Sequence, residues 1–407
     1  MKSMNMNILF GGIIVALLLV SCSQSSNTDN ATPGNGGPQY PAQLKIPSTG
    51  TNGIFDASLA QDPSASRVWM SYSSVSPSVM WPTGTPDAVE TRLAYSDTQG
   101  ETWFDAALLI PYTDVDLVFL TQPPFNLDAS FRAGTWQSEV SSLVFDASAT
   151  DPNQKWKLLS MHYLAIKSER HFEHGWIGLK MAATPQELAT ATEIKLFSSA
   201  TYDPANNTIG GPSGVPVDGA PAIAFDTAIS TELNGCLIAE PGIMSTASAL
   251  YLSVDCIKSA TDTRVVLLKC TNPCNMTSVN GSNGWTYVGT SLTKADGDLF
   301  GADQGFTASN LVQSNGQNYL IVTPRSSTPS EGYYNGCKVF RFSNIDAAAL
   351  QRTDGVPDVV TTVNGDVGSF GGACTYLPSA SKAGVIRGQL FATATEKFRL
   401  FISGIMF

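Results

Sequence analysis

Three acidic residues are candidates for acid–base chemistry: Asp56, Glu139 and Glu240. Each lies at the start of a short apolar segment, which is followed by a turn and by a second segment rich in large apolar residues. Carboxyl groups that meet in one pocket can act as a general acid and as a base or nucleophile, if their surroundings push their pKa values apart. Cleavage of a glycosidic bond uses such a pair. The sequence therefore predicts a carboxyl site, provided that the fold brings these segments together.

Alternatives remain open for each of these residues. A different alignment of the second segment moves Glu139 by one residue relative to Asp56, and such a shift turns a side chain to the other face of a strand. The segment that begins at Asp218 could replace the one that holds Glu240. A lone acidic residue at a strand end can also simply cap a turn.

The segments that carry the acids belong to a pattern that occurs five times. The repeats begin at residues 56, 139, 240, 307 and 374, so that successive starts are 83, 101, 67 and 67 residues apart. Four repeats contain four segments typical of strands, rich in β-branched and aromatic residues and bounded by turn residues, and the last contains three. Residues 43–46 could supply the missing strand and close a ring. The pattern predicts an all-β fold, a five-bladed β-propeller whose first strands line a channel, with a pair of β-sandwiches as the alternative.

One turn carries a motif known from propellers. The sequence from Ser96 to Trp103, SDTQGETW, resembles the Asp-box of sialidases, although Thr98 stands where the motif has Asp. The resemblance supports the fold and leaves a six-bladed sialidase-like propeller as a second possibility. Sialidases bind their substrate with three arginines, and nothing in the spacing of the early arginines, Arg67, Arg92 and Arg132, indicates such a triad.

The three acids together resemble the pattern of five-bladed glycoside hydrolases of the arabinanase, xylosidase and fructosidase type. That resemblance implies Asp56 as base or nucleophile, Glu139 as the residue that tunes pKa values, and Glu240 as general acid. It implies a glycan substrate, for which Trp136 and Arg67 are candidate binding residues. A propeller that binds a carbohydrate or a protein without catalysis is the alternative, because fold does not decide function.

Composition excludes several classes of protein. The chain has 407 residues, of which 14% are charged and 43% hydrophobic, with a net charge of −11. This composition argues against a helical bundle, and the negative charge argues against nucleic-acid binding, which needs clustered Lys and Arg. Neither a nucleophile elbow, a P-loop nor a dinucleotide fingerprint is present in the sequence.

The first residues resemble a bacterial lipoprotein signal. A thirteen-residue apolar run, Ile8–Val20, is followed by Ser21 and Cys22, and the sequence Leu19-Val20-Ser21-Cys22 is similar to a lipobox. We therefore expect residues 1–21 to be a signal peptide, Cys22 to be lipidated, residues 22–42 to form a flexible tether and residues 43–407 to form the propeller. The resemblance implies a monomer anchored through Cys22 to the cell envelope, at the outer membrane or the cell surface.

The remaining cysteines predict disulfides, because their number is even in a protein that we expect to be exported. Six cysteines allow fifteen pairings, and following the predicted hairpins we expect Cys236–Cys256, Cys270–Cys274 and Cys337–Cys374. We expect no cofactor. The segment His171–His174 reads as a solvated loop rather than a metal site, and the oxygen-rich set of Asp296, Asp298 and Asp303 is a weak candidate for Ca²⁺.

Overall fold

The computed structural model describes residues 41–47, 50–76, 88–116, 133–166, 169–198, 202–203, 208–209, 227–233, 236–277, 284–326, 336–365, 370–391, 394 and 396–407. Strands dominate these residues, so the predicted all-β fold is confirmed. The two α-helices are short, α1 (Thr227–Leu233) and α2 (Lys294–Asp298). None of the helices in this part of the chain is long and apolar enough to cross a membrane. The predicted signal peptide, Cys22 and most of the tether lie outside the described residues.

The first two repeats fold into antiparallel sheets that follow the chain order. The first contains β2 (Gly53–Ala60), β3 (Val68–Ser76), β4 (Ala88–Ser96) and β5 (Phe104–Ile110). The second contains β7 (Ala133–Phe145), β8 (Trp156–Ile166), β9 (Glu169–Ala182) and β10 (Ile194–Ser198), and β6 (Thr113–Asp116) pairs with the free edge of β7. The second strands β3 and β8 are buried almost along their whole length, so that both of their faces pack against other parts of the protein.

The next two repeats have the same arrangement. The third contains β13 (Leu237–Ser245), β14 (Ala249–Ser259), β15 (Asp262–Thr271) and β16 (Trp285–Thr293). The fourth contains β17 (Phe306–Ser314), β18 (Gln317–Pro324), β19 (Cys337–Asn344) and β23 (Val359–Val363), with β20 (Ala349–Leu350) also paired to β19. Two small ladders lie outside these sheets, β11 (Tyr202–Asp203) with β12 (Thr208–Ile209) and β21 (Arg352–Thr353) with β22 (Val356–Pro357).

The fifth repeat is completed by the beginning of the described chain. It contains β24 (Phe370–Thr375), β25 (Ile386–Leu390) and β26 (Phe398–Ile402), and β1 (Ala42–Leu44) pairs antiparallel with β26. The expectation that residues 43–46 supply the missing strand is therefore confirmed in essence. Strand β2 also meets β26 at Gly53, where an added Cβ would lie 1.8 Å from the carbonyl oxygen of Phe398. Only glycine fits this contact, which joins the first and fifth repeats into one sheet.

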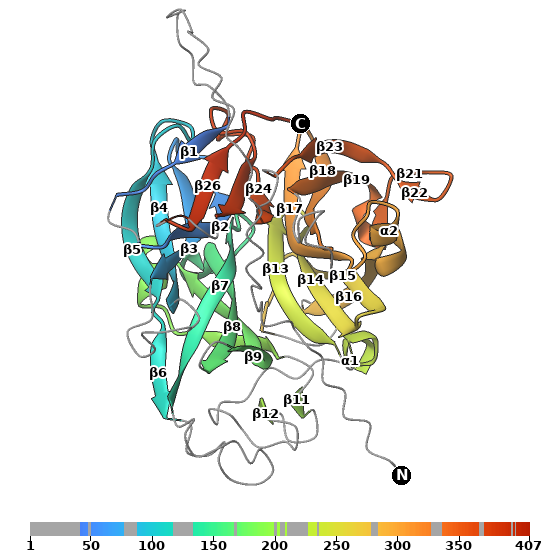
Figure 1. Cartoon of the computed structure of the whole chain (residues 1–407), viewed down its shortest axis with the longest axis horizontal. Helices are drawn as coiled ribbons and strands as arrows, with labels where there is room; N and C mark the ends of the chain where they lie inside the picture. The colour runs from blue at the N-terminus through green and yellow to red at the C-terminus, as the bar shows by residue number, and fades with distance from the viewer. Residues whose placement is uncertain are drawn as a thin grey trace, which may run out of the picture.

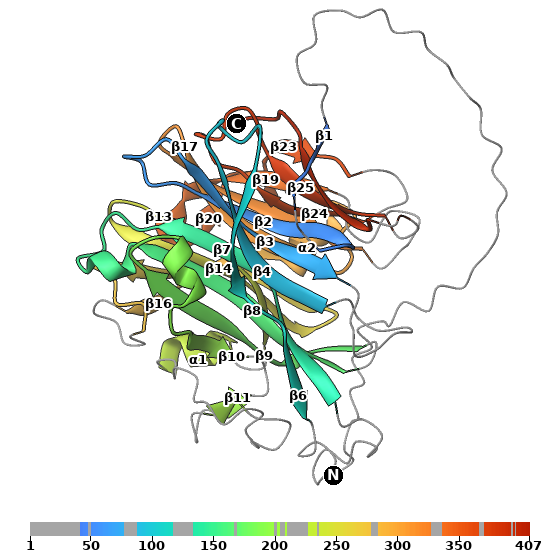
Figure 2. The ribbon, with the colours of Figure 1, turned by 90° about the vertical axis from the view of Figure 1, so that its left-hand side faces the viewer.

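The first strands of the five repeats, β2, β7, β13, β17 and β24, lie around a common centre (Figure 1). Each contacts the next, and β24 contacts β2. We call them the inner strands. Five apolar clusters fill the spaces between neighbouring sheets, one for each pair around the ring. Trp69 and Trp156, for example, meet edge to face between the first and second sheets. In the view of Figure 2, β6 and the end of β7 project from the body of the sheets.

Two details of the predicted strands need correction. Inner strands begin before the predicted repeat starts, at Phe370 rather than Cys374 in the fifth repeat and at Ala133 rather than Glu139 in the second. The segment His171–His174 lies in β9 rather than in a loop, because the hairpin of β8 and β9 continues past the apolar segment, with Leu164 opposite His171. Backbone pairing in a hairpin depends only weakly on side-chain polarity, so the apolar pattern underestimates its length. All three predicted disulfides are present.

Candidate functional site

Each inner strand has one residue in the left-handed backbone region, at an equivalent place. These residues, with φ between 47° and 50°, are Asp56, Val140, Glu240, Ala308 and Ala373. The pairing with the second strand of the sheet skips at each of them, so each is part of a β-bulge. The left-handed region costs a residue other than glycine roughly 1–2 kcal/mol, and bulges often redirect side chains beside functional sites. The bulges therefore define equivalent positions in the five repeats.

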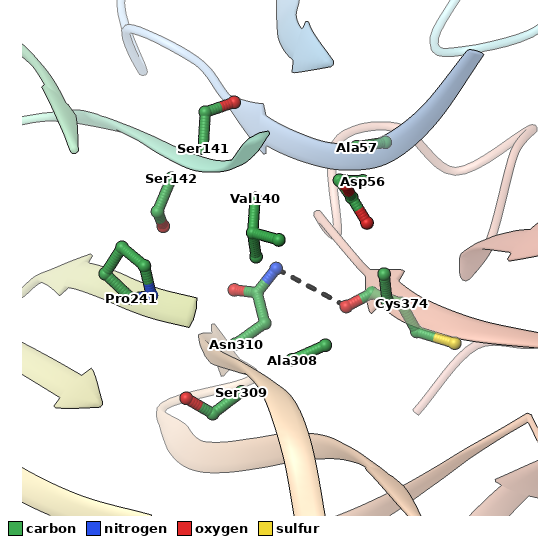
Figure 3. Close-up of a pocket in the computed structure, with 11 residues that line it drawn as sticks. Asp56, Ala57, Val140, Ser141, Ser142, Pro241, Ala308, Ser309, Asn310 and Cys374 are labelled. Carbon is green, nitrogen blue, oxygen red and sulfur yellow. Dashed lines mark hydrogen bonds between the residues drawn. The ribbon is translucent and has the colours of Figure 1, made fainter. Parts of the chain in front are cut away.

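A small cavity lies where the five bulges meet. Its volume is about 20 Å³, which is room for about one water molecule. Every inner strand contributes to its wall (Figure 3), through Asp56, Val140, Pro241, Ala308 and Cys374 among others. Asn310 crosses this region and donates a hydrogen bond to the carbonyl oxygen of Cys374. The cavity thus marks the axis of the ring.

Asp56 is a buried carboxyl group on this wall, with 8% of the residue exposed. The hydroxyl of Ser73, on the neighbouring strand β3, donates a hydrogen bond of 3.0 Å to its Oδ2 atom. Burial raises the pKa of Asp56 well above its usual range, and the negative charges of Glu139 and Glu240 raise it further. Asp56 therefore holds its proton to a higher pH than an exposed aspartate does.

Glu139 lies one residue before the bulge of β7, since Val140 has the position that corresponds to Asp56. The alternative alignment of the second repeat is therefore the one that the structure adopts. The hydroxyl of Tyr163 lies 3.1 Å from Glu139 Oε2, and Arg170 Nη1 lies 3.7 Å from the same atom. Burial raises the pKa of Glu139, the charge of Arg170 opposes this, and the charge of Glu240 adds to it. Glu139 is held in place by an arginine and a tyrosine.

Glu240 is at the bulge of β13, in the position equivalent to Asp56. Its Oε2 atom accepts hydrogen bonds from the hydroxyl of Thr307 and from the backbone N–H of Ala308, both on the next inner strand. Asp255, on β14, is 1% exposed and lies near Glu240 and Thr307. Burial, and then the charge of Glu240, raise the pKa of Asp255 well above its usual range. A fourth carboxyl group therefore belongs to the cluster.

The cluster joins Asp56, Glu139, Glu240 and Asp255, which come from three repeats, and we call it the acid cluster. The charges of Glu139 and Glu240 raise the pKa of Asp56, and the charge of Glu240 raises the pKa of Glu139 and of Asp255. Arginine side chains balance part of the negative charge, since Arg170 acts on Asp56 and Glu139, and Arg325 acts on Asp255. Buried carboxyl groups that share a site cannot all ionise together, so one can keep a proton while another is ionised. That is the condition for general acid–base catalysis.

The structure brings together the three predicted acids but not the two predicted binding residues. Ser73 contacts Asp56, and Arg67 precedes Ser73 by six residues, about 20 Å along an extended chain. Arg67 instead makes a bidentate ion pair with Asp97 at the other end of the sheet. Trp136 lies three residues before Glu139 on β7, and its ring packs against Trp176, 4.9 Å away between centroids. Odd spacing along a strand places Trp136 on the opposite face from Glu139.

Sequence reasoning missed three members of the site: Asp255, Tyr163 and Arg170. Asp255 carried a signal, since it ends the apolar segment 249–254 and pairs with Ala239, the residue before Glu240. Tyr163 and Arg170 carried none, because their roles depend on the length of the β8–β9 hairpin. Asp218, the alternative to Glu240, lies outside the described residues.

The candidate calcium ligands have other partners. Asp296 accepts hydrogen bonds at the N-terminus of α2 and forms an ion pair of 2.6 Å with Arg352, and Asp298 pairs with Lys294. Within the described ranges, no group of three or more His, Cys, Asp or Glu side chains could hold a metal ion. The turn that resembles an Asp-box joins β4 to β5, where Ser96 Oγ accepts hydrogen bonds from the backbone N–H groups of Thr98 and Gly100. That turn is structural.

No protein-family model matches the chain, and no curated relative matches its sequence. A thermostable family-43 glycoside hydrolase is similar over 86% of this chain and 88% of its own, with 10% identity and a TM-score of 0.45. The native arabinanase of Bacillus subtilis is similar over 87% of this chain and 94% of its own, with 9% identity and a TM-score of 0.41. The catalytic domain of the GH62 alpha-L-arabinofuranosidase of Coprinopsis cinerea is similar over 90% of this chain and 95% of its own, with 10% identity and a TM-score of 0.44. With TM-scores below 0.5, these likenesses carry no argument about activity.

The raised pKa of Asp56 predicts how its replacement affects stability. A carboxyl group whose pKa is higher in the folded than in the unfolded state stabilises the fold at low pH, and that contribution is lost as pH rises through the folded pKa. Each unit of difference corresponds to about 1.4 kcal/mol. We therefore expect Asp56→Asn to raise the free energy of unfolding at pH 8 by on the order of 1–2 kcal/mol, and to have little effect at pH 4. Urea unfolding at both pH values measures this.

Asp146→Asn is the matched control for this prediction. Burial acts to raise the pKa of Asp146, but hydrogen bonds from Lys157, 2.8 Å away, and Ser148 outweigh it and lower the pKa. This substitution should therefore destabilise the protein at pH 8. Equal effects of Asp56→Asn at pH 4 and pH 8 would contradict the raised pKa.

Proposed function

We propose that this protein is a five-bladed β-propeller that hydrolyses glycosidic bonds with the carboxyl groups of the acid cluster. The observation that carries the proposal is the meeting of Asp56, Glu139 and Glu240, from three separate repeats, in one electrostatically linked group of which Asp56 and Glu139 are buried. Glycosidic cleavage needs one protonated and one ionised carboxyl group on either side of the bond. Burial and mutual repulsion provide two protonation states at one pH.

The count of five blades is supported by packing. Five inner strands contact one another in a ring, and five apolar clusters lie between the successive sheets. A sixth blade, as in a sialidase-like propeller, would have to lie between two inner strands that already contact each other. Of the three early arginines, Arg67 pairs with Asp97 and Arg92 pairs with Asp105, whereas Arg132 lies outside the described residues.

The proposed roles follow the contacts of each acid. Asp56 acts as the base or nucleophile in its ionised form, which its raised pKa confines to a higher pH than for an exposed aspartate; the hydrogen bond from Ser73 goes to Oδ2 and leaves Oδ1 for a water or a sugar carbon. Glu139, fixed by Arg170 and Tyr163, tunes the cluster, since its charge raises the pKa of Asp56. Glu240 is the acid that protonates the leaving oxygen. Because Glu139 acts on Asp56 through its charge, its removal should shift the pH profile of kcat.

A panel of aryl glycosides tests this proposal. We expect the wild type to cleave at least one of them, and Asp56→Asn to lower kcat/KM by about 10²–10⁴-fold on every substrate cleaved. Glu240→Gln should lose as much on poor leaving groups but recover on dinitrophenyl glycosides, because a good leaving group needs no proton. Glu101→Gln, at an exposed site paired with Lys382, is the control and should keep full activity. Equal activity in all variants would refute the assignment.

A propeller that binds a glycan or a protein without catalysis is the second candidate. It is favoured by how closed the site is, since Asp56 is only 8% exposed and the axial cavity holds about one water. Calorimetric titration with envelope glycans distinguishes the two. Binding that is unchanged by Asp56→Asn and Glu240→Gln, without any hydrolysis, would favour this candidate.

We also propose that the protein acts as a monomer anchored to the cell envelope by lipid on Cys22. The support is the lipobox-like end of the apolar run and the polar segment that follows it. We expect radioactive palmitate to label the full chain expressed in a bacterium with an outer membrane, and Cys22→Ala to abolish both the label and recovery in the membrane fraction. Unlabelled wild-type protein, released in soluble form, would contradict the anchor.

A further inference from the structure

The buried carboxyl group of Asp255 has no part in the roles proposed above. Asp255 lies on β14 opposite Ala239, directly beside the bulge that carries Glu240. The residue is 1% exposed, and neither carboxyl oxygen has a hydrogen-bond partner of standard geometry among the described residues. Leaving an ionised carboxylate in such a place costs several kcal/mol or more, so that the group tends to stay protonated instead. Its position must therefore be explained.

The first repeat shows what this position does. Ser73 on β3 lies opposite Phe55, directly before the bulge at Asp56, just as Asp255 lies opposite Ala239, directly before Glu240. The hydroxyl of Ser73 donates its hydrogen bond to Asp56. In the first and third repeats, the second strand thus places one polar side chain beside the acidic residue of the bulge. A serine can donate at any pH, whereas an aspartic acid can donate only when it is protonated.

The groups around Asp255 favour the protonated form. Glu240 on β13 faces it with a negative charge, Thr307 on β17 offers a hydroxyl, and Arg325, after the end of β18, acts on it through its positive charge. Arg325 also donates a hydrogen bond of 2.8 Å to Gln304 Oε1. Burial and Glu240 outweigh Thr307 and Arg325, so the pKa of Asp255 lies well above its usual range. Glu240 Oε2, in contrast, accepts hydrogen bonds from the hydroxyl of Thr307 and from the backbone N–H of Ala308.

We propose that Asp255 is a positioning residue whose protonated carboxyl group donates a hydrogen bond to ionised Glu240, so that the two groups hold one proton between them. The pair carries one negative charge at neutral pH instead of two. Its proton rests on Asp255, the more deeply buried partner, and can pass to Glu240 without a change in the charge of the pair.

One consequence rests on the proposed function. If Glu240 is the general acid, its proton comes from Asp255: the Asp255 O–H bond breaks, the proton passes through Glu240, and it ends on the leaving oxygen. The pair then carries two negative charges until it takes up a proton from water. The shared proton itself does not depend on this step, and its test uses no substrate.

Infrared difference spectroscopy tests the shared proton directly. The background is Asp56→Asn/Glu139→Gln, which removes the other carboxyl groups of raised pKa among the described residues. We expect this protein to show the C=O band of a protonated carboxylic acid at pH 7, and we expect the band to vanish when Asp255→Asn is added. In the background with Glu240→Gln, the band should persist but disappear at a pH at least about one unit lower, because the neighbouring charge is gone.

Two results would overturn the proposal. An absent band in the background protein at pH 7 would mean that Asp255 is ionised. A midpoint that Glu240→Gln leaves unchanged would mean that the proton is not shared with Glu240. Asp255→Ser, which copies the serine of the first repeat, is the control for folding. At pH 5 this variant should unfold at the same temperature as the wild type. Between pH 5 and pH 8 its free energy of unfolding should fall by less than that of the wild type.

If aryl glycosides are cleaved, Asp255→Asn separates this proposal from the hydrolase itself. We expect the variant to keep the substrate KM and to shift the alkaline limb of the kcat profile to lower pH, whereas a merely structural role would move neither limb. An inactive wild type would refute the hydrolase and leave the spectroscopic result as it stands.

Discussion

The ring of sheets closes where β1 and β2 both meet β26, and the rest of the structure depends on this closure. Each sheet buries apolar side chains against two neighbours, so that no sheet could cover its faces alone. Pairing the start of the described chain with its end removes two free edges at once. The contact at Gly53, which tolerates no Cβ, shows how little room this closure leaves.

Closure also makes the acid cluster possible. Inner strands that are far apart in sequence are forced to one axis, where the bulges aim their side chains toward neighbouring strands. Packing among the sheets offsets the free energy that buried, mutually repelling carboxyl groups cost. The hydrogen bonds from Ser73 to Asp56, from Tyr163 to Glu139 and from Thr307 to Glu240 each hold one acid in place. A strained polar centre inside an apolar ring is the pattern expected of a functional site.

The repeat pattern was enough to predict the strands, because short β-branched segments between turn residues are local features. It located Asp56 and Glu240 on inner strands, where the structure has them at equivalent bulges, and residues 43–46 at the closing edge. It could not fix Glu139, since one residue of register decides the face of a strand and apolar periodicity tolerates either choice. Asp255 was missed for a different reason: its role depends on pairing across a hairpin and on burial, which no single segment reveals. Arg67 shows the converse, because a cation near an acid in sequence need not lie near it in space.

The central claim is that acids from different repeats act on one another through their charges. A double-mutant cycle of Asp56→Asn and Glu240→Gln, read as the free energy of urea unfolding at pH 8, tests it most directly. Each single substitution removes the same repulsion, so we predict that the double variant gains less stability than the sum of the two, by about 0.5–2 kcal/mol. The difference should disappear near pH 4, where Asp56, whose pKa is raised, is protonated and carries no charge. Additive effects at pH 8, within about 0.3 kcal/mol, would contradict the existence of the cluster.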